Sequence, residues 1–210
     1  MEHVATEVNP QMGLVRWKSH QSVQRYYRQG VGVAVLGLLA WAGVATDPAA
    51  AVRFADGTVQ FAGVPLLGKV STTDNHVWAW GATYFFTVKV PADASEPLGR
   101  VVLQQKEGVD SVSFNLKRTY AYLAGDRHQR VSVEASNSDK DSIEIRFTEP
   151  VPPGSTVTLG LRPYNNPDTG GVYLFGVTTF PQGDKVRGQF IGYGRLQFYE
   201  NSFFRSWGWP

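Results

Sequence analysis

The sequence predicts an all-β protein, and three observations carry that prediction. From Val52 onward the apolar residues recur with a period of two, which is typical of strands with one buried face. Turn-forming residues separate these segments at short intervals. Hydrophobic residues make up 42% of the chain and charged residues 18%, a composition that supports a globular core and excludes a polytopic membrane protein. We therefore expect a single antiparallel β-sandwich of the immunoglobulin-like kind.

The N-terminal 51 residues carry the three parts of a secretory signal peptide. Arg25 and Arg28 precede an apolar stretch at 31–45, and Pro48 and an Ala-Ala-Ala site at 49–51 follow it. The apolar stretch is shorter than the roughly 20 residues that a membrane-spanning helix needs. We expect cleavage after residue 51 and no transmembrane span afterwards. A start at Met12 and retention of the segment as an anchor are the alternatives.

Within each predicted strand of the mature chain, apolar and polar residues alternate. Tyr84, Phe86 and Val88 share one face of the first clear strand, with Thr87 and Lys89 on the other. The expected strands are 84–90, 100–105, 130–135, 142–147 and 156–162, and the expected turns between them are 91–99, 106–110, 137–141 and 149–155. A helical turn is expected near Tyr120–Gly125. The domain boundaries are thus 1–51 for the signal peptide, 52–200 for the sandwich and 201–210 for an aromatic C-terminal tail.

One further strand, "VYLFGV" at Val172–Val177, is apolar on both faces. This pattern favours a central strand, or one whose outer face another segment covers. Gly176 at its middle predicts a bulge or the close approach of a neighbour. The preceding "NNPDTGG" (165–171) reads as the long turn that leads into it.

Long ordered motifs resemble a known family. "VQFAGVPLL", "VWAWGATYFFTVKVP", "EPLGRVVLQQKEGVD", "PVPPGSTVTLGLRPYNNPDTGGVYLFGVTTFPQG" and "RGQFIGYGRLQFYE" occur in this order. Together they resemble an exported cyanobacterial family known as a domain of unknown function, the one numbered 2808. The resemblance covers about 52–200 and implies an exported, β-rich protein, with no reaction, cofactor or site to carry over.

Composition removes several classes of function. Cysteine is absent, which excludes disulfides, thiolate zinc sites and cysteine nucleophiles. The formal net charge is +2 and no basic stripe is present, so we expect no nucleic-acid partner. His3, His20, His76 and His128 fit neither a G-x-S-x-G elbow nor an H-E-x-x-H pair. We expect no catalytic residue and no cofactor.

Carboxylates and amides in the turns offer weaker candidates. Glu107 with Asp110, and Asp139 with Asp141, are close in sequence and could serve a hydrolase only if they met in a cleft. Asn165, Asn166 and Asp168 are weak candidates for calcium ligands, but their spacing does not match a calcium loop and turns use the same residue types.

Aromatic residues are the most distinctive candidates for binding. Trp78 and Trp80 share a face if their segment is extended, and could stack on sugar rings, but burial of at least one in the core is the favoured interpretation. The tail "NSFFRSWGWP" holds Phe203, Phe204, Arg205, Trp207 and Trp209. It either folds back over the sandwich or docks on a partner.

The sequence thus favours an exported, non-catalytic sandwich that acts as a structural or binding module. Its expected location is the cyanobacterial envelope, the periplasm or exterior, or the lumenal side of the thylakoid membrane. The expected partner is an envelope or membrane protein, docked through the tail, or a polysaccharide. A carbohydrate-binding module that uses surface tryptophans is the first alternative. The second is a hydrolase that uses loop carboxylates, with Glu107, Asp110 or His128 in its site.

Overall fold

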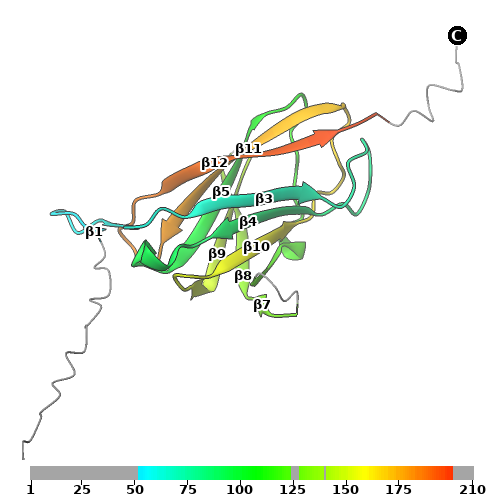
Figure 1. Cartoon of the computed structure of the whole chain (residues 1–210). Coiled ribbons are helices and arrows are strands. Elements are labelled where there is room, and N and C mark those ends of the chain that lie inside the picture. Colours follow the sequence, from blue (N-terminus) through cyan, green and yellow to red (C-terminus); the bar gives the residue numbers. More distant parts are fainter. Residues whose placement is uncertain (1–51, 124–127, 140, 201–210) are drawn as a thin grey trace, which may run out of the picture. The chain divides into compact units, whose positions relative to one another are not determined.

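The computed structural model describes residues 52–123, 128–139 and 141–200 (Figure 1). All of them belong to one compact unit, Ala45–Pro210. The expected signal peptide, residues 1–51, and the expected aromatic tail, residues 201–210, lie outside the described residues. Neither of these two predictions is therefore tested here.

Two five-stranded antiparallel sheets form the domain. The first has the order β3 (Leu66–Thr72), β4 (Tyr84–Lys89), β10 (Thr156–Leu161), β6 (Tyr120–Leu123) and β7 (Arg130–Val131). The second has the order β12 (Gln189–Phe198), β11 (Gly171–Pro181), β5 (Leu98–Glu107), β9 (Ser142–Val151) and β8 (Val133–Asp139). A small ribbon of β1 (Val52–Arg53) and β2 (Val59–Gln60) precedes them, and two helical turns lie at η1 (Ala92–Ala94) and η2 (Leu116–Arg118).

The strand order is that of an immunoglobulin-like sandwich, which confirms the prediction. β3-β4-β10-β6 takes the places of strands A-B-E-D, and β12-β11-β5 takes those of G-F-C. One difference is that β9, the neighbour of β5 on its far side, follows β6 in the chain rather than preceding it. The chain between strands C (β5) and E (β10) therefore follows a different order from the usual one, and it includes the β8–β9 hairpin.

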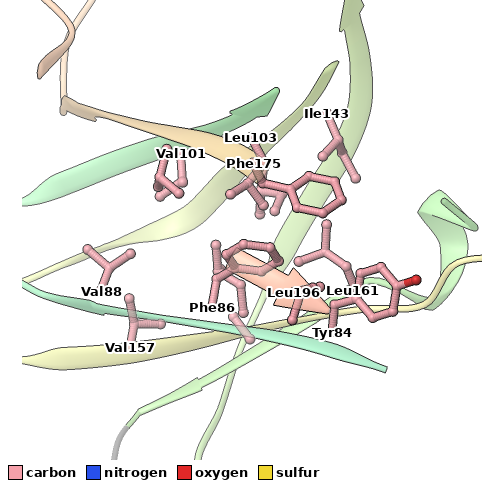
Figure 2. Close-up of a cluster of buried hydrophobic side chains, with 14 of the residues drawn as sticks. Tyr84, Phe86, Val88, Val101, Leu103, Ile143, Val157, Leu161, Phe175 and Leu196 are labelled. Carbon is pink, nitrogen blue, oxygen red and sulfur yellow. The ribbon is translucent and has the colours of Figure 1, made fainter. Parts of the chain in front are cut away.

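The core lies between the sheets and follows the predicted alternation. Tyr84, Phe86, Val88 and Val90 point inward from the β4 segment and are buried. In Figure 2 Phe86 lies opposite Phe175 of the other sheet, and their ring centroids are 5.8 Å apart in an edge-to-face arrangement. Complete burial of one such side chain contributes roughly 1.5–3 kcal/mol, so the two facing rows stabilise the sandwich.

Strand β11 is central, as predicted, because it pairs with β12 on one side and β5 on the other. Register shifts fall on both sides of Gly176, between Leu174 and Phe175 against β5 and between Val177 and Thr178 against β12. A Cβ at Gly176 would lie 3.4 Å from both the Lys106 stem and the Phe190 ring, an ordinary van der Waals distance, so the register shifts support the expected bulge rather than a close approach. These neighbouring side chains cover its outer face at this point.

The prediction of a helical turn near Tyr120–Gly125 is wrong over Tyr120–Leu123. The segment near 120–125 begins as strand β6, because Tyr120 and Tyr122 stack on the outside while Ala121 is buried, which is a period of two. Tyr120 also lies over Gly160 of β10, where a Cβ would clash with its ring. Trp78 and Trp80 lie in a loop, so the condition under which they would share one face of a strand is not met.

Candidate functional site

Three connections meet at one end of the sandwich, which we call the loop end (Figure 1). They are the β3–β4 loop (73–83), the β5–β6 connection (108–119) and the β10–β11 loop (162–170). Residues 163–167 form the middle segment. On one side the Tyr164 N–H donates to the Ser113 carbonyl at 3.0 Å, and on the other the Asn166 N–H donates to the Ala79 carbonyl at 2.9 Å. The three connections therefore form one continuous, backbone-paired surface.

Asn166 is the central support of this surface. Its side chain is fully buried. Its Nδ2 donates to the carbonyls of Asp74, at 3.1 Å, and His76, at 2.8 Å, and its Oδ1 accepts from the Tyr84 hydroxyl at 2.9 Å. Burial raises the pKa of Tyr84, so the hydroxyl stays protonated and remains a donor. One amide side chain thus ties the β3–β4 loop to the β10–β11 loop and to the core.

The supported β3–β4 loop presents two exposed tryptophans. Trp78 is 59% exposed and Trp80 is 87% exposed, so the expectation that at least one of them lies in the core is wrong. Trp78 adopts φ 62°, a left-handed conformation that costs a bulky residue about 1–3 kcal/mol. Its N–H donates to the Pro167 carbonyl at 3.1 Å, which holds this conformation in place. The turn breaks the alternation that would have buried one of the rings.

Two exposed tyrosines extend the aromatic surface. Tyr164, in the middle segment, is 64% exposed, and Tyr199, just after β12, is 49% exposed. Tyr199 is fixed by its N–H, which donates to the Asn75 carbonyl at 2.8 Å, and by its carbonyl, which accepts from the Val77 N–H at 3.0 Å. We call Trp78, Trp80, Tyr164 and Tyr199 the aromatic rim. All four rings project from segments that backbone hydrogen bonds hold in place.

A groove of about 680 Å³ lies on the other flank of the middle segment. Buried Val112 and Ile143 contribute apolar surface to it. The polar side chains on its sides come from the β5–β6 connection and from the β8–β9 hairpin, and Tyr164 belongs to both the groove and the aromatic rim. Its polar lining residues are Ser113, Asn115, Lys117, Asn137, Asp139, Asp141 and Ser142. Its volume is in the range of ordinary ligand sites.

The groove is built before any ligand arrives. Gln105 of β5 clamps the connection, because its Nε2 donates to the Asp110 carbonyl at 2.6 Å and its Oε1 accepts from the Val112 N–H at 2.8 Å. The Asn115 N–H donates to the Arg162 carbonyl at 2.8 Å. The side of the groove that the β5–β6 connection forms therefore has a fixed backbone, which lowers the entropic cost of binding.

Asp110 fixes the start of β11. Its carboxylate accepts from the Thr169 N–H at 2.8 Å and from the Tyr173 hydroxyl at 3.1 Å. Burial alone raises the pKa of Asp110, but the hydrogen bonds from Thr169, from Tyr173 and from the Asp168 backbone outweigh it and hold the pKa below its ordinary value. The charged form is therefore part of the folded structure.

The weak calcium candidates have other partners within the protein. Asn165, Asn166 and Asp168 line a small pocket of about 130 Å³ together with Asp110. Asn166 uses its amide in the three hydrogen bonds above, and the Asn165 Nδ2 donates to the Asn166 carbonyl at 2.9 Å. Among the described residues there is no group of three or more histidine, aspartate or glutamate side chains placed to hold a metal ion.

Asp110 and His128, two of the hydrolase candidates, do not converge. His128 follows Leu123, which pairs with Val157 near the start of β10, whereas Asp110 lies near the Phe114–Pro163 bridge beyond the other end of β10. They are therefore at opposite ends of the sandwich. Asp139 and Asp141 both line the groove. The tail residues Phe203, Phe204, Arg205, Trp207 and Trp209 lie outside the described residues. Within the described ranges we find no helix with the length and apolar character to cross a membrane.

Sequence reasoning missed Asn115, Lys117, Asn137 and Tyr164, because no local motif marks them. They come together only through the pairing of 113–115 with 162–164 and through the position of the β8–β9 hairpin. A signal for Tyr164 was present, since an aromatic residue directly before the turn residues Asn165 and Asn166 has no strand alternation to bury it.

Strand order and loop end together define an immunoglobulin-like sandwich with a supported aromatic rim beside a polar groove. The chain belongs to the family described as "Protein of unknown function (DUF2808)", whose model matches residues 58–198. No curated protein matches the sequence.

Several solved structures align with low similarity. The collagen-binding domain of a Staphylococcus aureus adhesin aligns at 7% identity and a TM-score of 0.34, over 62% of this chain and 96% of its own. The collagen-binding subdomain of the Enterococcus faecalis surface protein ACE aligns at 7% identity and 0.36, over 64% and 94%. BslA, a bacterial hydrophobin, aligns at 11% identity and 0.38, over 66% and 100%. These scores carry no argument about function, and the fold assignment rests on the strand order.

Proposed function

We propose that this domain is a non-catalytic carbohydrate-binding module that holds a polysaccharide chain at its loop end. The observation that carries the proposal is the exposure of Trp78 and Trp80 on a loop that Asn166 fixes from beneath. Indole rings offer a flat apolar face and a polar N–H, which suits the alternating apolar and hydroxyl surfaces of sugars. Because the loop is already ordered, binding orders little additional chain.

The conformation of Trp78 supports a role in binding. A left-handed backbone at a bulky residue costs stability, and such strain persists where the surrounding structure imposes it, often at ligand sites. Glycine or asparagine would adopt the same turn at lower cost. The large side chain at this position is therefore unexplained by folding and is explained by a ligand that stacks on it.

Location and partner in this proposal follow from the sequence. The signal-peptide pattern of residues 1–51 supports export, and an exported sandwich meets polysaccharide in the envelope or outside the cell. The resemblance to an exported cyanobacterial family is in keeping with this setting. Docking of the tail 201–210 on a protein partner stays a prediction, and deletion of Asn201–Pro210 followed by recovery of bound proteins from native membranes tests it.

A glycan array followed by calorimetric titration tests the proposal. We expect the full chain to bind at least one neutral polysaccharide, and expect Trp78→Ala and Trp80→Ala each to weaken the affinity at least tenfold. Phe190→Ala and Tyr193→Ala are matched controls, because both rings are exposed on β12, away from the loop end, and should leave the affinity unchanged. Absence of binding to every glycan, or full affinity in the Trp78→Ala/Trp80→Ala double variant, would contradict the proposal.

A further inference from the structure

We infer that the groove beside Tyr164 is a second subsite, which takes an electrically neutral stretch of the same glycan chain and sets the length that the domain recognises. This inference rests on the proposed function, because it extends the ligand from the tryptophans into the groove. It adds Asn115 and Asn137, to which the sequence did not point, gives Asp141 a binding role, and places Tyr164 between the two subsites.

Continuity between the subsites follows from the backbone pairing. The middle segment bonds to the β3–β4 loop through the Trp78–Pro167 and Asn166–Ala79 backbone pairs. It bonds to the β5–β6 connection, which lines the groove, through the Tyr164–Ser113 pair. Tyr164 and Asn166 are two residues apart, a span of at most about 7 Å, and paired segments lie about 5 Å from their neighbours. The β3–β4 loop and the groove are thus separated by the middle segment alone, which bends at Tyr164 and Asn165, and an extended ligand can cross it by passing over Tyr164.

The lining of the groove fits a sugar ring. Val112, Phe114, Leu116 and Ile143 supply an apolar surface for the C–H face of a ring. The amides of Asn115 and Asn137 both donate and accept, and the carboxylate of Asp141 accepts from two hydroxyls at once. Hydroxyls on adjacent ring carbons need this combination of acceptors and donors.

Charge in the groove favours a neutral chain. Lys117 is the single cation among the described lining residues, against the carboxylates of Asp139 and Asp141. The groove therefore has no positive excess to attract uronate or sulfate groups, and each such group would meet two carboxylates. A neutral glycan avoids that repulsion.

Chain length separates this inference from the proposed function. We choose the neutral polysaccharide that binds best and titrate its disaccharide and its hexasaccharide into the full chain. The hexasaccharide should bind at least tenfold more tightly, because only it reaches both subsites. Asn115→Ala and Asp141→Asn should remove most of that gain and leave the disaccharide affinity unchanged. Asp141 adopts φ 58°, a conformation that asparagine tolerates, so the second variant should fold normally.

Each outcome has one meaning. If Trp78→Ala and Trp80→Ala abolish binding while the groove variants keep the full length gain, the second subsite is refuted and the proposed function stands. If the tryptophan variants have no effect, the proposed function fails first. A hexasaccharide of the matching uronic acid should bind at least tenfold more weakly than the neutral one, and equal or tighter binding would overturn the assignment of a neutral ligand. Asn165→Ala, an exposed amide outside the groove lining, is the control and should retain the length gain.

Discussion

The core strands and the loop end reach a fixed geometry by different means. In the core, many inward side chains from β4, β10 and β11 contribute apolar contacts, so each contact has neighbours that support the same arrangement. At the loop end the geometry depends on single polar groups, above all Asn166 and Asp110. The difference shows that the two regions should fail differently: the core through lost apolar contact, and the loop end through one unpaired hydrogen bond.

The largest expected effect lies in the core. Phe175→Ala should lower the free energy of unfolding by about 3–5 kcal/mol, because the ring packs against Tyr84, Phe86 and Phe114 and leaves a cavity. Urea unfolding followed by circular dichroism measures it. Phe190→Ala on the outer face is the control and should change stability by less than about 1 kcal/mol. Similar losses in the two variants would remove the distinction between inner and outer rows.

Next in size is the central support of the loop end. Asn166→Leu keeps the branched shape of the side chain but leaves the Tyr84 hydroxyl and the carbonyls of Asp74 and His76 without this partner. A buried polar group without a partner costs about 1–3 kcal/mol, so we expect a loss of at least about 2 kcal/mol by urea unfolding. Glycan affinity should fall as well, because the tryptophan loop is no longer fixed. An Asn165→Ala variant that lost as much would show that burial of Asn166 is not the cause.

A smaller, pH-dependent effect belongs to Asp110. Its folded-state pKa lies below its ordinary value of about 4, so its contribution to stability is complete above that value and is lost as the pH falls through the folded pKa. Asp110→Asn should therefore be less stable than the parent chain at neutral pH, and the gap should narrow in acid. Urea unfolding from pH 7 to pH 2.5 measures the gap, and a gap that stays constant would mean that the carboxylate charge is not involved.

The smallest expected effect has the opposite sign. Trp78→Gly removes the strain of a left-handed tryptophan, since glycine adopts φ 62° freely, and should stabilise the domain by up to about 1 kcal/mol. The same change should abolish glycan binding. Thermal unfolding and calorimetry on one preparation test both halves. Destabilisation by more than about 1 kcal/mol would mean that the exposed ring supports the fold after all.

This comparison also explains what the sequence could predict. The β-sandwich, the inward row of β4 and the central place of β11 follow from a period of two, which is local information. The exposure of Trp78 and Trp80 does not, because it depends on Asn166, whose partner Tyr84 is 82 residues away in the chain. The groove depends on residues near 115, 140 and 164 that only the topology brings together. The strand at Tyr120–Leu123 was missed because its partner is Gly160, whose missing side chain makes room for Tyr120.

Fluorescence of the two loop-end tryptophans tests the central claim most directly. In a full chain with Trp17, Trp41, Trp207 and Trp209 replaced by phenylalanine, only Trp78 and Trp80 emit. The account predicts long-wavelength emission and strong quenching by iodide for the free protein, since both indoles are exposed. Addition of the bound neutral hexasaccharide should shift the emission to shorter wavelength and protect both indoles from iodide. Unchanged emission and quenching at a hexasaccharide concentration that saturates binding would contradict the account.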